Sequence, residues 1–140
     1  MKKRVPVLIF IVILLVSIST TAHARASEYF GCTAVYATAL DDGEVLIEYD
    51  IDPTHTMLEC GARVIWIYEE QSNGKFEDVF TYHMDDYPEM IQHNSIIGDG
   101  EVTYQGTPGL QYYALVGVYA KDANGSETMY FYTNVVTARN

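Results

Sequence analysis

The side chains that could support catalysis or metal binding are scattered along this chain. In the region after residue 26 the histidines are His55, His83 and His93, without the His-x-x-x-His spacing that would hold zinc. Serine and acidic residues occur, but no Gly-x-Ser-x-Gly element presents a nucleophile. Carboxylates are so frequent that no pair stands out as the acid and base of a glycosidase. We therefore predict no catalytic residue, no metal site and no cofactor, and keep a small secreted hydrolase as an alternative.

Three short acidic clusters could offer oxygen ligands to calcium, which takes roughly six to eight of them. They are Asp41-Asp42 with Glu44, Asp85-Asp86 with Glu89, and Asp99 with Glu101. None has the Asp-x-Asp-x-Asp-Gly order of a dedicated calcium loop. We favour a solvated acidic surface, with a calcium-stiffened structural module as an alternative.

The first 26 residues have the three-part layout of a secretory signal peptide. A basic head precedes an apolar run from Val7 to Ile18, which is shorter than the roughly 20 residues of a membrane-spanning helix. Small residues follow, and the predicted cleavage lies after Ala24 or after Ala26. An uncleaved membrane anchor is the alternative. We therefore predict a secreted, extracellular product, residues 27–140, that forms a single domain and has no membrane attachment after cleavage.

Charge restricts the partners of this predicted product. After residue 26, four basic residues stand against 19 acidic ones, so the net charge is −15 with histidine neutral. Such a field repels nucleic acid and anionic lipid head groups, so we predict no nucleic-acid partner.

The chain's two cysteines, Cys32 and Cys60, form an even pair in a predicted exported protein. Such pairs usually form a disulfide, and no Cys-x-x-Cys motif indicates a redox thiol. We predict a Cys32–Cys60 disulfide.

The sequence patterns predict that the candidate functional side chains lie on β-strands and the turns between them. Glu44 to Asp52 alternates between apolar and acidic residues, which is typical of an antiparallel strand with one face in water. Arg63 to Glu70 reads as another strand, and Asn73-Gly74 predicts a hairpin turn after it. A two-residue turn there would place acidic residues opposite each other, so a longer loop or a bulge is an open alternative. About seven strands with frequent turn signals predict an all-β antiparallel β-sandwich.

The clearest hairpin lies between Leu110 and Val136, around Asn124-Gly125. A type I′ turn at these two residues would pair Ala120 with Met129 and Val118 with Phe131. The side chains that alternate with these would face outward, and they include Tyr113, Tyr119, Tyr130 and Tyr132. If the Trp66 side chain points inward, Ile65 and Ile67 join this outward set.

Clustered outward aromatic residues are typical of a recognition surface. We therefore predict a non-enzymatic binding module whose partner is an extracellular protein or a glycan, with self-association through the tyrosine face as a further option. The structural alternative is that cross-strand tyrosine pairs stabilise the sheet and that Tyr132 covers the gap at Gly117. A bare face would favour recognition, and a face covered by Met90 to Ile97 would favour the structural role.

The segment Pro108-Gly-Leu-Gln-Tyr112, the alternating Ala114, Val116 and Val118, and the following Ala120 to Ser126 resemble the end of a fibronectin type III or immunoglobulin-like domain. Trp66 resembles the core tryptophan of immunoglobulin domains. The whole chain also resembles small exported proteins of Gram-positive bacteria. The resemblance implies a sandwich fold and carries no activity, because such domains host many unrelated functions.

Overall fold

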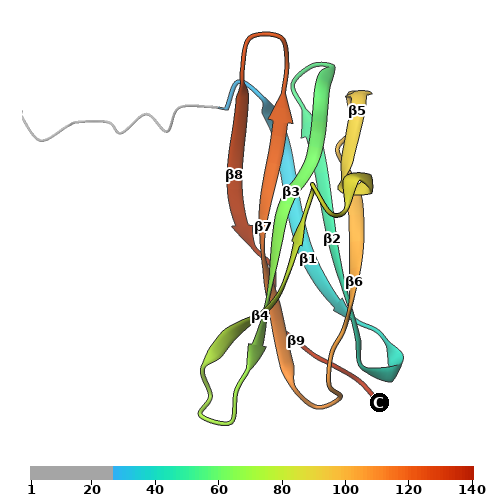
Figure 1. The fold of residues 1–140 in the computed structure, drawn as a ribbon, viewed down its shortest axis with the longest axis vertical. Helices are drawn as coiled ribbons and strands as arrows, with labels where there is room; N and C mark the ends of the chain where they lie inside the picture. The colour runs from blue at the N-terminus through green and yellow to red at the C-terminus, as the bar shows by residue number, and fades with distance from the viewer. Residues whose placement is uncertain (1–26) are drawn as a thin grey trace, which may run out of the picture.

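Two antiparallel sheets make up the part of the chain that the computed structural model describes, residues 27–140 (Figure 1). The predicted signal peptide lies outside the described residues. Sheet A has the strand order β1-β2-β6, and sheet B has the order β4-β3-β7-β8, with β5 beside β3 and β9 beside β7. The predicted all-β antiparallel sandwich is confirmed, with nine strands in place of about seven. The bounds are β1 (Phe30–Ala39), β2 (Glu44–Pro53), β3 (Met57–Glu70), β4 (Phe76–His83), β5 (Ile91–Ser95), β6 (Gly100–Gln105), β7 (Gln111–Lys121), β8 (Ser126–Tyr132) and β9 (Val136–Thr137), with short 3-10 turns η1 (Asp41–Gly43) and η2 (Pro88–Met90).

The core lies between the sheets and is built by period-two alternation. Strand β2 buries Val45, Ile47, Tyr49 and Ile51 and turns its acidic residues outward, as the sequence predicts. Strands β3 and β7 supply the facing layer, including the fully buried Ile65, Ile67, Ala114, Val116 and Val118. Burying each large aliphatic side chain is worth about 1.5–3 kcal/mol, so this layer supplies much of the driving force for folding.

Strand β3 is long enough to have two successive neighbours on one side. Its first half pairs with β5, and its second half, from Val64 onward, pairs with β4. The change occurs at Gly61, whose φ is +157°, and at a bulge between Ala62 and Val64. A Cβ at Gly61 would lie 2.0 Å from the carbonyl oxygen of Met90, so only glycine allows this close approach.

The β3–β4 hairpin resolves the register that the sequence left open. A bulge between Ile67 and Tyr68 shifts the pairing, so that Tyr68 lies opposite Asp78 and Glu70 lies opposite Phe76. Glu69 and Glu77 still face each other, and the Glu69 carboxylate accepts a hydrogen bond from the Tyr112 hydroxyl at 2.5 Å. The hairpin loop and the β7–β8 loop lie at opposite ends of the molecule (Figure 1).

The predicted disulfide is wrong, because Cys32 and Cys60 are both free. Cys32 lies on β1, opposite Asp52 of β2, and is exposed, whereas Cys60 points from β3 of the other sheet into the core. A disulfide needs Cα atoms within about 7 Å and Cβ atoms directed at each other, and opposite orientations in different sheets do not provide this. Gly98 packs against the Cys60 sulfur, where a Cβ would lie only 2.4 Å away.

The two thiols should therefore differ sharply in reactivity. Burial, with a smaller contribution from Asp99, raises the pKa of the Cys60 thiol to about 11. We predict that iodoacetamide at pH 8 modifies Cys32 in the native protein and modifies Cys60 only after unfolding, as read by mass spectrometry. A Cys32→Ser variant, as control, should show no native labelling. Protection of both thiols until a reductant is added would contradict this assignment.

Candidate functional site

The outer face of sheet B carries the aromatic residues that the sequence singles out. On β7 the inward positions are Tyr112, Ala114, Val116 and Val118, all buried, and Tyr113 and Tyr119 alternate with them on the outer side. On β8 the outward residues are Tyr130 and Tyr132, 57% and 67% exposed. The four predicted tyrosines therefore share one face.

The predicted register of the β7–β8 hairpin is wrong by two residues. Ala120 pairs with Glu127 and Val118 pairs with Met129, because the connection is a loop of four residues, Asp122 to Gly125. The Asp122 carboxylate accepts hydrogen bonds from the backbone N–H groups of Asn124 and Gly125, at 2.7 and 3.0 Å. Neither of these two residues has positive φ, so a type I′ turn is absent here. A shift of two residues keeps every side chain on its predicted face.

The predicted place of Ile65 and Ile67 on this face is wrong. Both isoleucines are fully buried, and the alternation of β3 turns Trp66 and Tyr68 outward instead. Trp66 therefore does not occupy the core position that its resemblance to the immunoglobulin tryptophan implies. The side-chain chemistry could have predicted this orientation of β3. Trp and Tyr carry a polar group that can remain in water, whereas the isoleucine side chain has none.

Seven aromatic side chains lie on this outer surface, which we call the aromatic face: Trp66, Tyr68, Phe76, Tyr113, Tyr119, Tyr130 and Tyr132. The Tyr113 ring is at its centre, stacked on Tyr68 at 4.8 Å between centroids and tilted against Phe76 at 4.9 Å. Tyr132 meets Tyr113 edge-on at 5.8 Å, so the rings form a row across four strands. Trp66 and Tyr130 form a second contact at 6.0 Å.

The rings of the aromatic face differ in what they can offer a partner. Tyr119 is buried, with the Arg63 guanidinium 5.6 Å above its ring and its hydroxyl donating to Glu59 at 3.3 Å. Burial also raises the pKa of Tyr119 and of Tyr113. Among the described residues, no partner bonds the hydroxyls of Tyr130 and Tyr132, which are therefore the most available groups.

Gly117 explains part of the arrangement. Its missing side chain leaves space that the Tyr130 ring fills, since a Cβ at Gly117 would lie 3.0 Å from that ring and 2.8 Å from Val64. The predicted role of covering Gly117 therefore belongs to Tyr130, not to Tyr132, as follows from the two-residue shift. Tyr132, which is also exposed, does not cover Gly117.

Charge is distributed unequally between the outer faces of the two sheets. The outer face of sheet A presents five acidic side chains and no basic one: Glu44, Glu48, Asp50, Asp52 and Glu101. The outer face of sheet B, over β4, β3, β7 and β8, has three acidic side chains and two of the four basic ones: Glu59, Glu70, Asp78, Arg63 and Lys121. The aromatic face is thus nearly neutral in a strongly acidic molecule.

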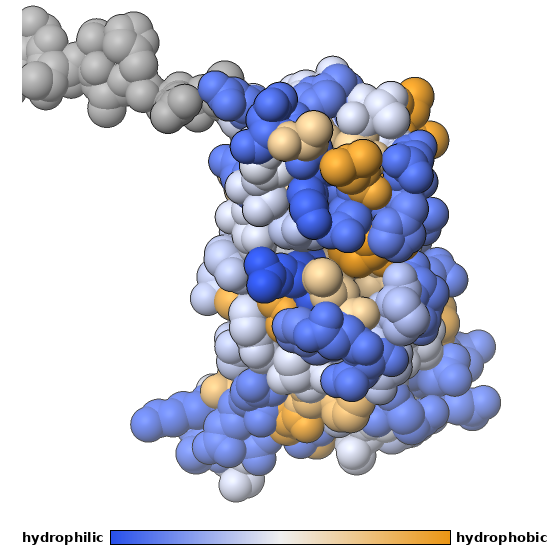
Figure 2. All heavy atoms as spheres, turned by 45° about the horizontal axis from the view of Figure 1, so that its top comes forward, coloured by the Kyte–Doolittle hydropathy of each residue, from blue (hydrophilic) through white to orange (hydrophobic). Residues whose placement is uncertain are grey.

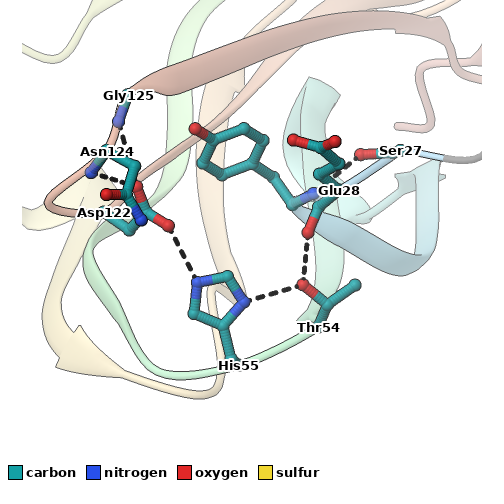
Figure 3. A network of polar contacts seen from close by, with 8 residues as sticks. Ser27, Glu28, Thr54, His55, Asp122, Asn124 and Gly125 are labelled. Atoms are coloured by element: carbon teal, nitrogen blue, oxygen red, sulfur yellow. Dashed lines mark hydrogen bonds and ion pairs between the residues drawn. The ribbon is translucent and has the colours of Figure 1, made fainter.

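A hydroxyl, an imidazole and a carboxylate meet beside the β7–β8 loop (Figure 3). This loop lies at the opposite end of the molecule from the β3–β4 loop (Figure 1). His55 Nδ1 lies 3.0 Å from Thr54 Oγ1, and His55 Nε2 lies 3.0 Å from Asp122 Oδ2. In a catalytic relay the hydroxyl gives its proton to the imidazole. Here the Thr54 hydroxyl donates to the Glu28 carbonyl oxygen at 2.5 Å. The arrangement therefore ties the β2–β3 loop to the β7–β8 loop and to the start of the described chain.

No group of three or more His, Cys, Asp or Glu side chains in residues 27–140 is arranged to hold a metal ion. In one of the three acidic clusters, Asp99 accepts a hydrogen bond from the backbone N–H of Ile51 at 2.8 Å. Within the same residues, no helix has the length and apolar character needed to cross a membrane.

A hollow of about 350 Å³ lies between the exposed edges of the sandwich, where β1 and β8 approach each other. Its lining comes from Ser27, Phe30, Gly31, Cys32, Thr33, Met129 and Phe131. Exposed aliphatic residues also occur away from the aromatic face, among them the adjacent Ile96 and Ile97, and the face seen in Figure 2 is mainly hydrophilic with small hydrophobic spots. The aromatic face is thus the most concentrated set of candidate binding groups.

The comparisons with known proteins identify no family for this chain, so its class rests on the fold alone. No family model matches it, and a search of the curated proteins gave no match. The class that the structure establishes is an antiparallel all-β protein with a sandwich-like fold, compatible with immunoglobulin-like and fibronectin type III-like domains.

The Asp122 contacts predict a specific pH dependence. Hydrogen bonds from the backbone N–H of Asn124, and next from His55, lower the pKa of Asp122 below its ordinary value of 3.8. A carboxylate with a lower pKa in the folded state stabilises the protein above the unfolded value and loses this effect as pH falls through the folded value. Below about pH 4.5, urea unfolding should therefore show a steeper loss of stability for the natural chain than for Asp122→Asn. Parallel profiles would refute this role.

Proposed function

We propose that this protein is an exported, non-enzymatic binding module that recognises an extracellular protein or glycan through its aromatic face. The observation that carries the proposal is the combination of exposed rings and low charge on one sheet face of a molecule with net charge −15 after residue 26. Enrichment in Tyr and Trp with depletion of charged residues is the compositional signature of a protein-binding surface.

The position of β5 adds support. It pairs with Met57, Glu59, Cys60 and Gly61 of β3, in the plane of the sheet. Trp66 and Tyr68 lie farther along β3, between β4 and β7. The Met90 to Ile97 segment therefore leaves the aromatic face bare, which is the arrangement expected of a recognition surface.

We also propose that the sandwich is of the immunoglobulin-like or fibronectin type III-like kind. In such domains a tyrosine near the start of a late strand bonds to the backbone a few residues upstream. Here the Tyr112 hydroxyl, near the start of β7, accepts a hydrogen bond from the backbone N–H of Thr107 at 2.8 Å. The contact matches the tyrosine corner of those families and supports the likeness seen at Pro108 to Tyr112.

The binding proposal is tested by removing the two exposed rings. We expect Tyr130→Ala and Tyr132→Ala each to weaken binding at least about tenfold, because tyrosines at the centre of an interface commonly contribute 1–2 kcal/mol or more. The measurement is binding of the purified protein to an array of extracellular glycans and to a panel of exported proteins, by biolayer interferometry.

Tyr36→Ala is the matched control, because Tyr36 lies on the outer face of sheet A, where its hydroxyl donates to Asp50. This variant should keep the affinity of the natural chain. If all three variants bind every detected partner with equal affinity and remain folded, the aromatic face is not the recognition surface.

A further inference from the structure

We infer that the aromatic face binds a neutral polysaccharide chain, an inference that rests on the proposed function and names its ligand class. Three classes of occupant could cover a face rich in aromatic rings: a cationic protein, a second copy of this chain, or a neutral glycan. The charges and the chemistry of the face discriminate among them.

A cationic partner would be attracted by clustered carboxylates. Those carboxylates are on the other side of the molecule, where Glu44, Glu48, Asp50, Asp52 and Glu101 cover the outer face of sheet A. The aromatic face instead carries Arg63 and Lys121, half of the basic residues that follow residue 26. Arg63 already lies over the Tyr119 ring, where a cation from a partner would stack.

A second copy is disfavoured by the overall charge. Each copy carries a net charge of −15 after residue 26, and a charge so far from zero keeps proteins apart in solution. The apolar area of the face is also provided mainly by rings, and the aliphatic Leu115 and Val64 among them are both at least partly buried. Stable dimer interfaces instead resemble a domain core.

A neutral sugar chain is not repelled by the basic residues of the face or by the net charge of the protein, and it can contact both the rings and the hydroxyls of the face. The apolar C–H side of a pyranose ring can stack on an aromatic ring, and its hydroxyls need hydrogen-bond partners at the ring edge. Five of the seven aromatic residues are tyrosines, and Thr81 and Thr128 lie beside them as the partners of Trp66 and Tyr119 in the sheet. The tyrosine and threonine hydroxyls can both donate and accept.

The spacing of the exposed rings suggests how such a chain would lie. Tyr130 and Tyr132 stand two residues apart on β8, which places them about 7 Å apart along the strand. Trp66 contacts Tyr130, and Tyr113 contacts Tyr132, so each exposed ring is held by a second ring beside it on the same face. Two preorganised rings favour a chain of several sugars over a single sugar, since a longer ligand contacts both.

Trp66 provides the test, because it is the chain's single tryptophan and lies on the aromatic face. Purified protein is titrated with neutral oligosaccharides of two to six units, from cello-, xylo-, manno-, malto- and chito-series, while Trp66 fluorescence is recorded. We expect saturable binding in at least one series, at least about tenfold tighter for the longer members than for the disaccharide. Tyr132→Ala should weaken that binding at least about tenfold, and Tyr36→Ala should leave it unchanged.

Ionic strength separates the three occupants. Binding of a neutral oligosaccharide should change less than twofold between low and high salt, whereas binding of a polylysine probe would weaken as salt screens charge. Self-association, followed by sedimentation velocity, would strengthen with salt. Salt-sensitive polylysine binding lost in Tyr132→Ala, without any oligosaccharide binding, would overturn the glycan inference and leave the binding proposal standing. If no oligosaccharide binds, and every partner found on the glycan array and the protein panel binds Tyr130→Ala and Tyr132→Ala as it binds the natural chain, both proposals fail.

Discussion

The pairing of β3 with β7 is the interaction on which the rest of this structure depends. The two strands run side by side from Glu59 opposite Lys121 to Glu69 opposite Tyr112. Because side chains alternate with period two, this register decides at once which residues form the core and which form the outer surface. A slip by one residue would bury Trp66 and Tyr68 and expose Ile65 and Ile67. The fully buried isoleucines therefore fix the aromatic rings outside.

The same constraint divides the molecule chemically. The outer side of sheet A carries carboxylates, which contribute to the negative net charge of the protein. The outer side of sheet B carries aromatic side chains, most of them with a polar hydroxyl or N–H group. Arg63 illustrates the coupling between fold and surface: the bulge at this position lets β3 change its neighbour from β5 to β4 and also brings a cation over Tyr119. Tyr119 is therefore held by the fold, while Tyr130 and Tyr132 remain available to solvent. The surface we assign to recognition is the part that the core does not require.

Much of the fold could be predicted from the sequence, because alternation on β2, β7 and β8 is nearly unbroken. The errors arose where two signals competed. Asn124-Gly125 is a strong turn signal, but the Asp122 side chain bonds both backbone N–H groups and produces a longer loop. Trp66 follows a run that is apolar on both faces, so pattern alone could not orient it. The pairing of Cys32 with Cys60 depended on three-dimensional proximity, which spacing does not report.

The central claim is that the exposed rings are present for recognition, and that their surface contacts, including the packing of Tyr130 over Gly117, contribute little to holding the sheet together. Its most direct test is the free energy of unfolding, measured in urea, for a Tyr130→Ser/Tyr132→Ser double variant beside Ile65→Ala. Truncating a fully buried isoleucine costs about 2–5 kcal/mol, whereas cross-strand ring contacts on a surface contribute about 0.5–1.5 kcal/mol each. We predict that the double variant loses less stability than Ile65→Ala alone. An equal or larger loss would show that these rings are kept for the fold.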